Sequence, residues 1–261
     1  MLRAIEIGLK IKSIDLKGDS FSIDVYEDFL WAKDKFKSDK ILNVVEKIIG
    51  KEIFSNPIQT FRVKKPNIKS IENFMDGLIG RTPWHQDEGT MNKKARFKTD
   101  LVTVWIPFTK TNAKNGCMLA VPKSNKLGLL NHQPGSKGQV EIKNSELIHK
   151  YSKMVPLEAD VGDIIILDKR LIHCSLPNVS KNIRISMDIR FHKAGQSSGR
   201  EPLPSFYVRS AKKEKIKVKT YQQWVALWNK AYMKSLNKGY TFKYYLPVYK
   251  HSKQDYSKKL N

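Results

Sequence analysis

Short runs of alternating or continuous apolar residues dominate the middle of the chain. PIQTFRVKKP (57–66) and IRISMDIRF (183–191) alternate between apolar and polar residues, and LVTVWIPF (101–108) is β-branched and aromatic, as strands are. GCMLAVP (116–122) and DIIILD (163–168) each accompany a glycine turn signal. Many short strands separated by Gly, Pro and Asn, without regular βα alternation, predict a mainly β fold with flanking α-helices, either a β-sandwich or a jelly-roll barrel.

Two segments show the helical period instead. Ser38 precedes the first segment and Gly50 follows it, which predicts a helix between them. Its apolar face is formed by Ile41, Leu42, Val45, Ile48 and Ile49. The second segment, TYQQWVALWNKAYMKSL (220–236), predicts a C-terminal helix packed on the β core. Its apolar stripe consists of Trp224, Leu227, Trp228, Ala231 and Tyr232.

Length and composition narrow the class of protein. A chain of 261 residues can bury one large core, so we expect a single domain over 1–261 with its jelly-roll core at about 55–192. A helical and strand segment precedes this core, and a helix at about 220–236 follows it. No apolar run approaches the length of a membrane span, the first residues lack a signal-peptide core, and the two cysteines have no framework spacing. These features predict no membrane span and a cytoplasmic location.

The chain carries a formal net charge of +23, from 48 Lys and Arg against 25 Asp and Glu. Such an excess could serve nucleic acid, acidic lipid or an anionic substrate. The lysines are scattered, however, and there is no zinc-finger spacing, glycine-rich phosphate loop or basic recognition helix. We therefore interpret the charge as a solvated surface that could steer a small anion, and we do not expect nucleic acid as the partner.

The stretch TPWHQDEGT (82–90) carries the first candidate chemistry. His85 and Asp87 are two residues apart, and side chains two apart on a strand point the same way, so both could reach one metal ion. The pair alone is weak evidence because it arises often by chance. A third ligand must come from His132, His149, His173, His192 or His251. Of these, His173 has the most context, since it follows a predicted strand at a loop.

The strand predicted at 183–191 has two unlike faces. One face is apolar, and the other carries Arg184, Ser186, Asp188 and Arg190. Either the polar face meets water at the outside of a sandwich, or it lines the interior of a barrel that holds a charged ligand. The pattern alone leaves both interpretations open.

Together these motifs resemble the phytanoyl-CoA dioxygenase-like branch of the Fe(II)/2-oxoglutarate-dependent oxygenases. The resemblance rests on H-x-D at 85–87 and on H-x-S-x-P-N from His173, with an arginine 11 residues after that histidine. The flanking stretches QTFRVKKP, NGCMLAVPKS and VPLEADVGDIIILDKRLIHCS follow in the family's order, and the resemblance runs from roughly 30 to 235. Lys123-Ser124-Asn125 departs from the Gly-Ser-His that the family often has, which affects one edge of the expected pocket.

The resemblance implies a double-stranded β-helix of cupin-like type in which His85, Asp87 and His173 bind Fe(II). Two imidazoles and one carboxylate on one face of octahedral iron leave positions for 2-oxoglutarate and O2.

The resemblance also implies how the chain binds 2-oxoglutarate. Arg184 would hold its remote carboxylate, because the arginine fork matches a carboxylate, and the hydroxyl of Ser175 would assist. Gln59 and Trp105 match positions that touch the co-substrate in relatives.

The implied reaction is hydroxylation of an unactivated C–H bond of a small metabolite, or its desaturation or cyclisation, with 2-oxoglutarate decarboxylated to succinate and CO2. Asp87 argues against halogenation, since halogenases of this superfamily lack the carboxylate. One alternative is the same chemistry on a carrier-bound or nucleic-acid substrate, and another is a non-catalytic basic jelly-roll binding module. The sequence identifies neither the substrate, for which an anion is one option, nor the oligomeric state.

Other candidates have less support. Arg62, Arg81 and Arg190 could bind an anionic substrate. Cys174 is interpreted as a small buried residue, and His192 as lying either at the pocket mouth or at an exposed strand end. The segments 123–156 and 193–212 are the candidates for a lid.

Overall fold

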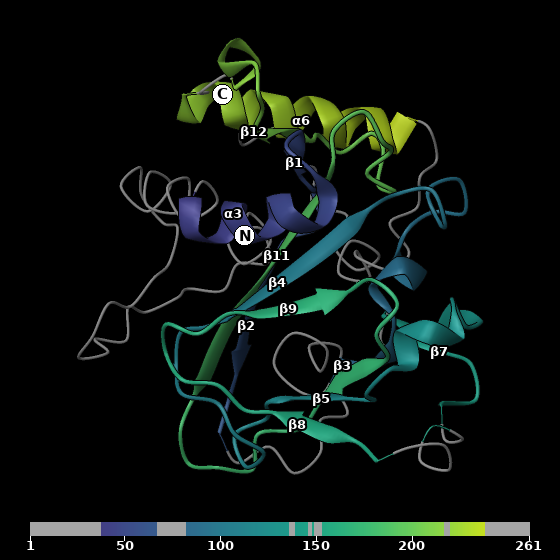
Figure 1. Ribbon diagram of the computed structural model, residues 1–261, viewed down its shortest axis with the longest axis vertical. Coiled ribbons are helices and arrows are strands. Elements are labelled where there is room, and N and C mark those ends of the chain that lie inside the picture. Colours follow the sequence, from purple (N-terminus) through teal and green to yellow (C-terminus); the bar gives the residue numbers. More distant parts are fainter. Residues whose placement is uncertain are drawn as a thin grey trace.

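A computed structural model describes residues 38–66, 82–135, 139–145, 148, 153–216 and 220–237. The strands in this part form two antiparallel sheets and a separate hairpin (Figure 1). The six-stranded sheet contains, in order, β12 (Phe206–Arg209), β1 (Ile53–Ser55), β11 (Arg184–Lys193), β4 (Leu101–Pro107) and β9 (Ile165–Asp168), with β2 (Thr60–Lys64) also paired to β11. The four-stranded sheet contains β3 (Thr82–His85), β10 (His173–Ser175), β5 (Met118–Ala120) and β8 (Val155–Leu157). The hairpin joins β6 (His132–Pro134) to β7 (Val140–Ile142). The predicted mainly β jelly-roll architecture is confirmed.

The ten-residue strand β11 organises the larger sheet. β1 and β2 pair with β11 at its two ends, and β4 pairs with it from Ser186 to His192. Its apolar residues Met187, Ile189 and Phe191 lie in the main hydrophobic core. The polar residues of the other face are all buried, and Arg184, Asp188 and Arg190 line a pocket to which both sheets contribute side chains. The interior interpretation of this polar face is therefore confirmed.

The helix α3 (Asp39–Ile49) covers the outer face of the six-stranded sheet. Ser38 occupies its N-cap position, and Gly50 follows at φ 87°, a backbone conformation that favours glycine. Four of the five predicted face residues are buried. Ile48 is 54% exposed, so its placement on the buried face was wrong: it lies at the edge of the stripe, in the last helical turn.

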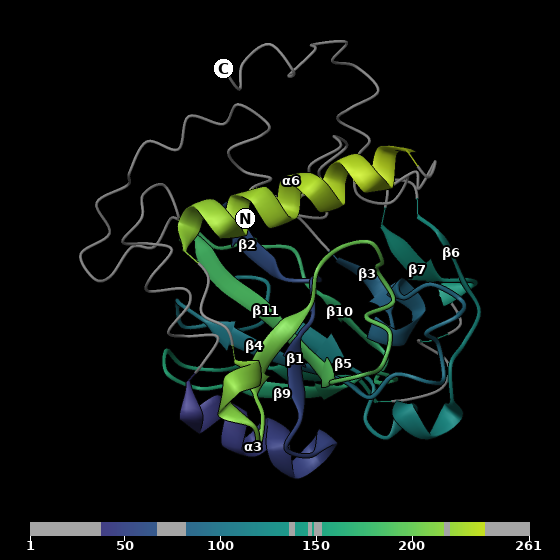
Figure 2. The same ribbon diagram turned by 90° about the horizontal axis from the view of Figure 1, so that it is seen from above.

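The helix α6 (Tyr221–Asn237) confirms the predicted C-terminal helix, and in the view of Figure 2 the strands β1, β4 and β11 lie between it and α3. Ala231 is buried and Leu227 and Trp228 are half-buried, whereas the side chains of Trp224 and Tyr232 lie outside the described part. Neither helix in the described ranges is long and apolar enough to cross a membrane.

The fully described 3-10 turns are η1 (Asp87–Thr90), η2 (Ser124–Leu127) and η4 (Lys213–Lys215). The segment 123–156, interpreted as a weakly patterned loop, contains η2 and the β6–β7 hairpin, and its role as a lid stays a prediction. The strand predicted at 21–25 lies outside the described residues.

Candidate metal centre and adjoining pocket

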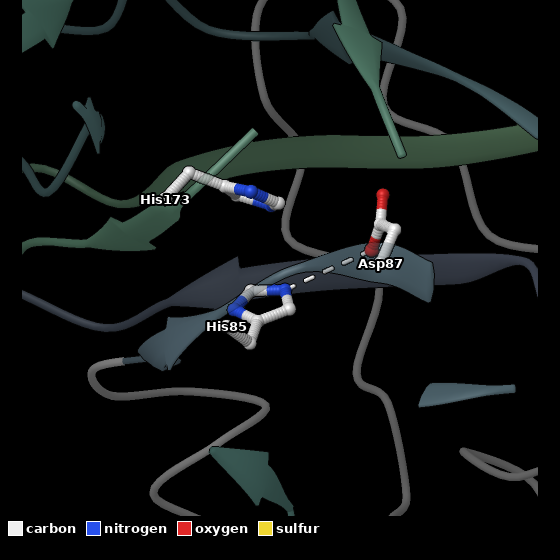
Figure 3. A group of neighbouring side chains, drawn as sticks. All are labelled: His85, Asp87 and His173. Carbon is white, nitrogen blue, oxygen red and sulfur yellow. Dashed lines mark ion pairs between the residues drawn. The ribbon is translucent and has the colours of Figure 1, made fainter. Parts of the chain in front are cut away.

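The three predicted metal ligands lie together, with their side chains turned toward a common space (Figure 3). His85 and His173 line the pocket, and Asp87 lies beside them. His85 ends β3, Asp87 begins η1, and His173 begins β10 directly opposite His85 in the antiparallel pair. One ligand atom from each residue lies within 4.8 Å of the other two, and all three residues are buried. The strand pairing thus brings residues from two distant segments within reach of one ion.

Each histidine is held in the tautomer that a metal site needs. Nδ1 of His85 lies 2.9 Å from the carbonyl oxygen of Pro83, and Nδ1 of His173 lies 3.0 Å from that of Leu171. Because a carbonyl only accepts, Nδ1 of each ring carries a proton, so Nε2 is the atom that a metal ion would bind. Burial, and then the neighbouring His173, lower the pKa of His85 to about 3, so this ring is neutral near pH 7.

Asp87 is completely buried and both of its oxygens are bonded. Nη2 of Arg190 donates to Oδ1 at 2.8 Å, and the hydroxyl of Thr103 donates to Oδ2 at 2.5 Å. Burial would raise the pKa of Asp87, but Arg190 and then the two histidines hold it well below its ordinary value. Two imidazole nitrogens and one carboxylate are the donor set of a non-haem Fe(II) site, so the residues present fit that ion.

Arg184 lies in the same pocket and is fully buried. Its Nη2 donates to the carbonyl of Gly116 at 2.7 Å and its Nη1 to the hydroxyl of Ser186, while Nε has no hydrogen-bond partner in the described part of the chain. The guanidinium carbon lies 5.7 Å from the ring centre of Trp105, which also lines the pocket. Burial, and then Arg62, lower the pKa of Arg184 to about 10.

A second buried basic residue, Lys64, adjoins Arg184 and was not predicted from the sequence. It lies directly opposite Arg184 in the β2–β11 pair and is 1% exposed. Its Nζ donates to Oγ of Ser175 at 2.8 Å and to the carbonyl of Leu176. Burial, then Arg184 and Arg62, lower the pKa of Lys64 to about 6. No described carboxylate lies within ion-pair distance of Lys64 or Arg184, as an anion-binding site would require.

The two remaining residues expected near the co-substrate differ in their surroundings. Oγ of Ser175 accepts hydrogen bonds from Lys64 and from the backbone N–H of Thr82, so its own proton can be donated into the pocket. Gln59 is not among the lining residues. Its side chain instead bonds the backbone of Arg190 in both directions, at 3.0 and 2.9 Å, and its predicted contact with the co-substrate stays a prediction.

The weaker candidates also have definite places. Arg62 pairs with Asp188 at 3.0 Å and both line the pocket. Cys174 is buried, as predicted. His192 is buried and contacts Asn56 at 3.3 Å, so the alternative of an exposed strand end was wrong. Arg81, His149 and His251 lie outside the described residues.

Two site residues, Lys64 and Thr103, were not predicted from the sequence. Arg190 was predicted only as a possible partner of an anionic substrate, and in the structure it bonds the metal-ligand candidate Asp87. Thr103 and Arg190 lie opposite each other in the β4–β11 pair. Alternation could have identified Thr103, because it shares a strand face with Trp105, two residues on. Lys64 had no comparable signal among the 48 basic residues of the chain.

The fold and this donor set define a class of protein, the jelly-roll oxygenases that hold one non-haem metal. Among solved structures, the apo form of the non-heme monooxygenase ThoJ has a TM-score of 0.57 at 16% identity, covering 82% of this chain and 75% of that one. The family model described as phytanoyl-CoA dioxygenase (PhyH) matches residues 15–186. The chain therefore belongs to the phytanoyl-CoA dioxygenase family.

Curated relatives match only part of their own length. The phytanoyl-CoA dioxygenase domain-containing protein 1 homolog of Dictyostelium discoideum is 30% identical over 119 residues, 43% of this chain and 41% of that protein. The 1-deoxypentalenic acid 11-beta-hydroxylase of Streptomyces exfoliatus is 26% identical over 198 residues, 69% of this chain and 66% of that protein. The chain thus spans between two fifths and two thirds of these relatives.

Proposed function

We propose that the chain is an Fe(II)- and 2-oxoglutarate-dependent dioxygenase that oxidises an unactivated C–H bond of a small anionic metabolite. The observation that carries this proposal is the meeting of His85, Asp87 and His173 within reach of one ion, beside two buried basic side chains. The family membership and the names of the relatives, which include a dioxygenase and a hydroxylase, support it.

At the metal end, the chain presents a donor set that is oriented before any ion arrives. His85 and His173 offer their Nε2 lone pairs, and Asp87 offers one carboxylate oxygen. Arg190 and Thr103 fix that carboxylate from two sides, which reduces the rearrangement needed on binding. When bound, Fe(II) with 2-oxoglutarate and O2 supplies the oxidising chemistry, in which 2-oxoglutarate becomes succinate and CO2.

At the other end, Arg184 and Lys64 bind the remote carboxylate of 2-oxoglutarate. Both side chains are withdrawn from water, where a charge-assisted hydrogen bond is strongest. The hydroxyl proton of Ser175 supplies a further donor, since Lys64 already occupies one side of its oxygen.

The balance of charge supports an anionic primary substrate. Four basic side chains surround the pocket, and two carboxylates accompany them. The basic residues are Arg62, Lys64, Arg184 and Arg190, and the carboxylates are Asp87 and Asp188. The charges of Fe(II) and dianionic 2-oxoglutarate offset each other. One positive charge is then left, or two once Lys64, whose pKa is about 6 in the unliganded chain, takes up a proton beside the bound co-substrate. A buried excess of charge is costly. A substrate carboxylate or phosphate would reduce that excess, and the net charge of +23 would attract it.

Anaerobic absorption spectroscopy tests the metal and co-substrate assignment. Fe(II) with 2-oxoglutarate should give a weak visible charge-transfer band, and Asp87→Ala should abolish it. Asp188→Ala is the matched control, because it removes a buried pocket carboxylate that is not a proposed ligand, and it should retain the band. A well-folded, iron-loaded protein that shows no band and releases no succinate in air would refute the proposal.

A succinate-release screen over small-metabolite pools tests the substrate class. For each compound that stimulates release, mass spectrometry should find a gain of one oxygen or, for desaturation or cyclisation, a loss of two hydrogens. The acid should react faster than its methyl ester, which has the same scaffold without the charge. An ester that reacts as well as its acid would contradict the anionic substrate while leaving the dioxygenase assignment in place.

A further inference from the structure

Two fully buried polar residues alternate with the ligands of the metal turn. Gln86 and Glu88 have zero exposure, and neither belongs to the group of possible metal ligands formed by His85, Asp87 and His173. Burying a carboxylate costs free energy unless cations and hydrogen-bond donors compensate for the lost water. The partners of Glu88 therefore indicate what this residue does.

Glu88 binds three donors from two other segments. Its Oε1 accepts the backbone N–H of Phe97 at 2.7 Å and lies 3.1 Å from Nζ of Lys169. Its Oε2 accepts Nε of Arg170 at 2.5 Å. The backbone N–H of Glu88 also donates to the carbonyl of Lys169 at 2.9 Å. Both the side chain and the backbone of Glu88 therefore bind the loop that contains Lys169 and Arg170.

That loop leads to the third ligand. Lys169 and Arg170 follow β9, and His173 begins β10 three residues after Arg170. Gln86 holds the same loop, because its Nε2 donates to the carbonyl of Arg170 at 2.7 Å. The residues on either side of Asp87 therefore bind the segment that delivers His173.

The contact with Phe97 shows that the backbone around Glu88 is constrained. Phe97, whose N–H binds Glu88, has φ 67°, in the left-handed region that residues other than glycine rarely adopt. Such a conformation persists where surrounding contacts over-determine it. Arg170 also lies over the Phe97 ring, with 5.6 Å between the guanidinium carbon and the ring centre.

We infer that Glu88 is a positioning residue of the metal centre: by joining the Asp87 turn to the loop that carries His173, it sets the spacing of these two ligands. The inference rests on the proposed metal site. Glu88 touches neither metal nor substrate, and it acts through the two backbone segments that it ties together.

Metal titration of purified protein with Co(II), well below the unfolding temperature, tests this role. Glu88→Gln keeps the shape and the acceptor for Phe97 but removes the charge that binds Lys169 and Arg170. It should raise the Kd for Co(II) about tenfold or more, the range seen when groups that orient metal ligands are removed. Arg170→Gln weakens the same contact from its solvent side, without stranding the buried carboxylate, and should give a smaller increase.

Glu52→Gln is the matched control. Glu52 also binds a backbone N–H, that of Ala211, and a lysine, Lys215, and it lies away from the pocket lining. This variant should lower thermal stability as a lost contact does, while binding Co(II) with the Kd of the parent.

The outcomes separate this inference from the proposed function. If the parent fails to bind Co(II), the proposed metal site is wrong and the inference falls with it. If the parent binds but Glu88→Gln and Arg170→Gln bind equally well, Glu88 is only structural and the inference alone is overturned. Should Glu88→Gln fail to fold, Arg170→Gln alone decides in the same way.

Discussion

The two ends of the pocket differ in how completely the chain neutralises its own charges. At the metal end Asp87 is bonded by Arg190 and Thr103, and each ligand histidine is bonded through Nδ1. At the other end Lys64 and Arg184 lie opposite each other, and no described carboxylate pairs with either. The metal end is thus organised by the protein, whereas the basic end has no carboxylate of its own and suits an anionic ligand. Mutations at the two ends should therefore affect different ligands.

Arg184→Gln should show the largest difference between its effect on 2-oxoglutarate binding and its effect on metal binding. Loss of a buried, forked cation should raise the KM for 2-oxoglutarate on the order of 100-fold, because breaking one side of a buried charge pair costs about 2–5 kcal/mol. The Kd for Co(II) should stay that of the parent. Arg184→Lys keeps the charge but not the planar pair of donors, so its KM for 2-oxoglutarate should lie between those of the parent and of Arg184→Gln. An equal loss of Co(II) binding would show that the two ends are not independent.

Lys64→Met should raise the KM for 2-oxoglutarate by roughly tenfold, since one charge-assisted hydrogen bond contributes about 1.5–3 kcal/mol. Co(II) binding should again be unaffected. Lys65→Met, a change at the next residue, which is exposed, is the control for general effects of charge. If both variants raise KM equally, the buried position of Lys64 has no special role.

The pH dependence of 2-oxoglutarate binding should reveal Lys64 directly. In the unliganded protein its pKa is about 6, so the side chain is mostly neutral above that pH. A bound carboxylate raises this pKa, and binding then takes up a proton. The affinity should therefore fall by up to tenfold per unit as pH rises above about 6. Calorimetry in buffers of different ionisation enthalpy measures this proton uptake, which should be absent in Lys64→Met.

Stability should vary with pH in the opposite sense. The pKa of Lys64 is lower in the folded chain than its ordinary value of 10.5, so the unfolded chain binds more protons between these values. The free energy of unfolding of the unliganded parent, relative to Lys64→Met, should rise with pH across this window. Urea unfolding at pH 6.5 and 8.5 compares the two, and a difference that falls or stays flat would place the lysine pKa elsewhere.

The smallest effect is expected from Thr103→Val at the metal end. It preserves shape but removes one hydrogen bond to Asp87, and the Kd for Co(II) should rise several-fold. The affinity for 2-oxoglutarate, measured in the Co(II)-saturated protein, should not change. A larger change in 2-oxoglutarate binding than in metal binding would reverse the assignment of the two ends.

Features that depend on local pattern were accessible from the sequence. Alternation and turn residues located the strands, and helical spacing with its glycine stop located α3. Side-chain type and spacing suggested His85 and Asp87 as a pair and favoured His173 as their partner. The family resemblance completed the ligand set and added Arg184, and the structure gathers these residues in one place. Even here local pattern had a limit, because it could not show that Ile48 lies beyond the buried stripe of α3.

Features that depend on pairing between distant segments were not accessible. Lys64 faces Arg184 only because β2 pairs with β11, more than a hundred residues away, and nothing in RVKK marks this lysine as buried. The roles of Arg190 and Glu88 likewise follow from partners that the fold brings to them. Whether the polar face of 183–191 meets water or lines the pocket depends on where the second sheet lies, and no local pattern contains that information.

The two-sidedness of β11 also bears on how this chain must fold. A slip of one residue against β4 would turn Arg184, Asp188 and Arg190 into the apolar core and send Met187 and Ile189 into the pocket. Intermediates with the wrong register would therefore bury several charges in the apolar core. Because that is unfavourable, the misaligned strands would separate again. The alternation that places the polar residues in the pocket thus also favours the correct strand register during folding.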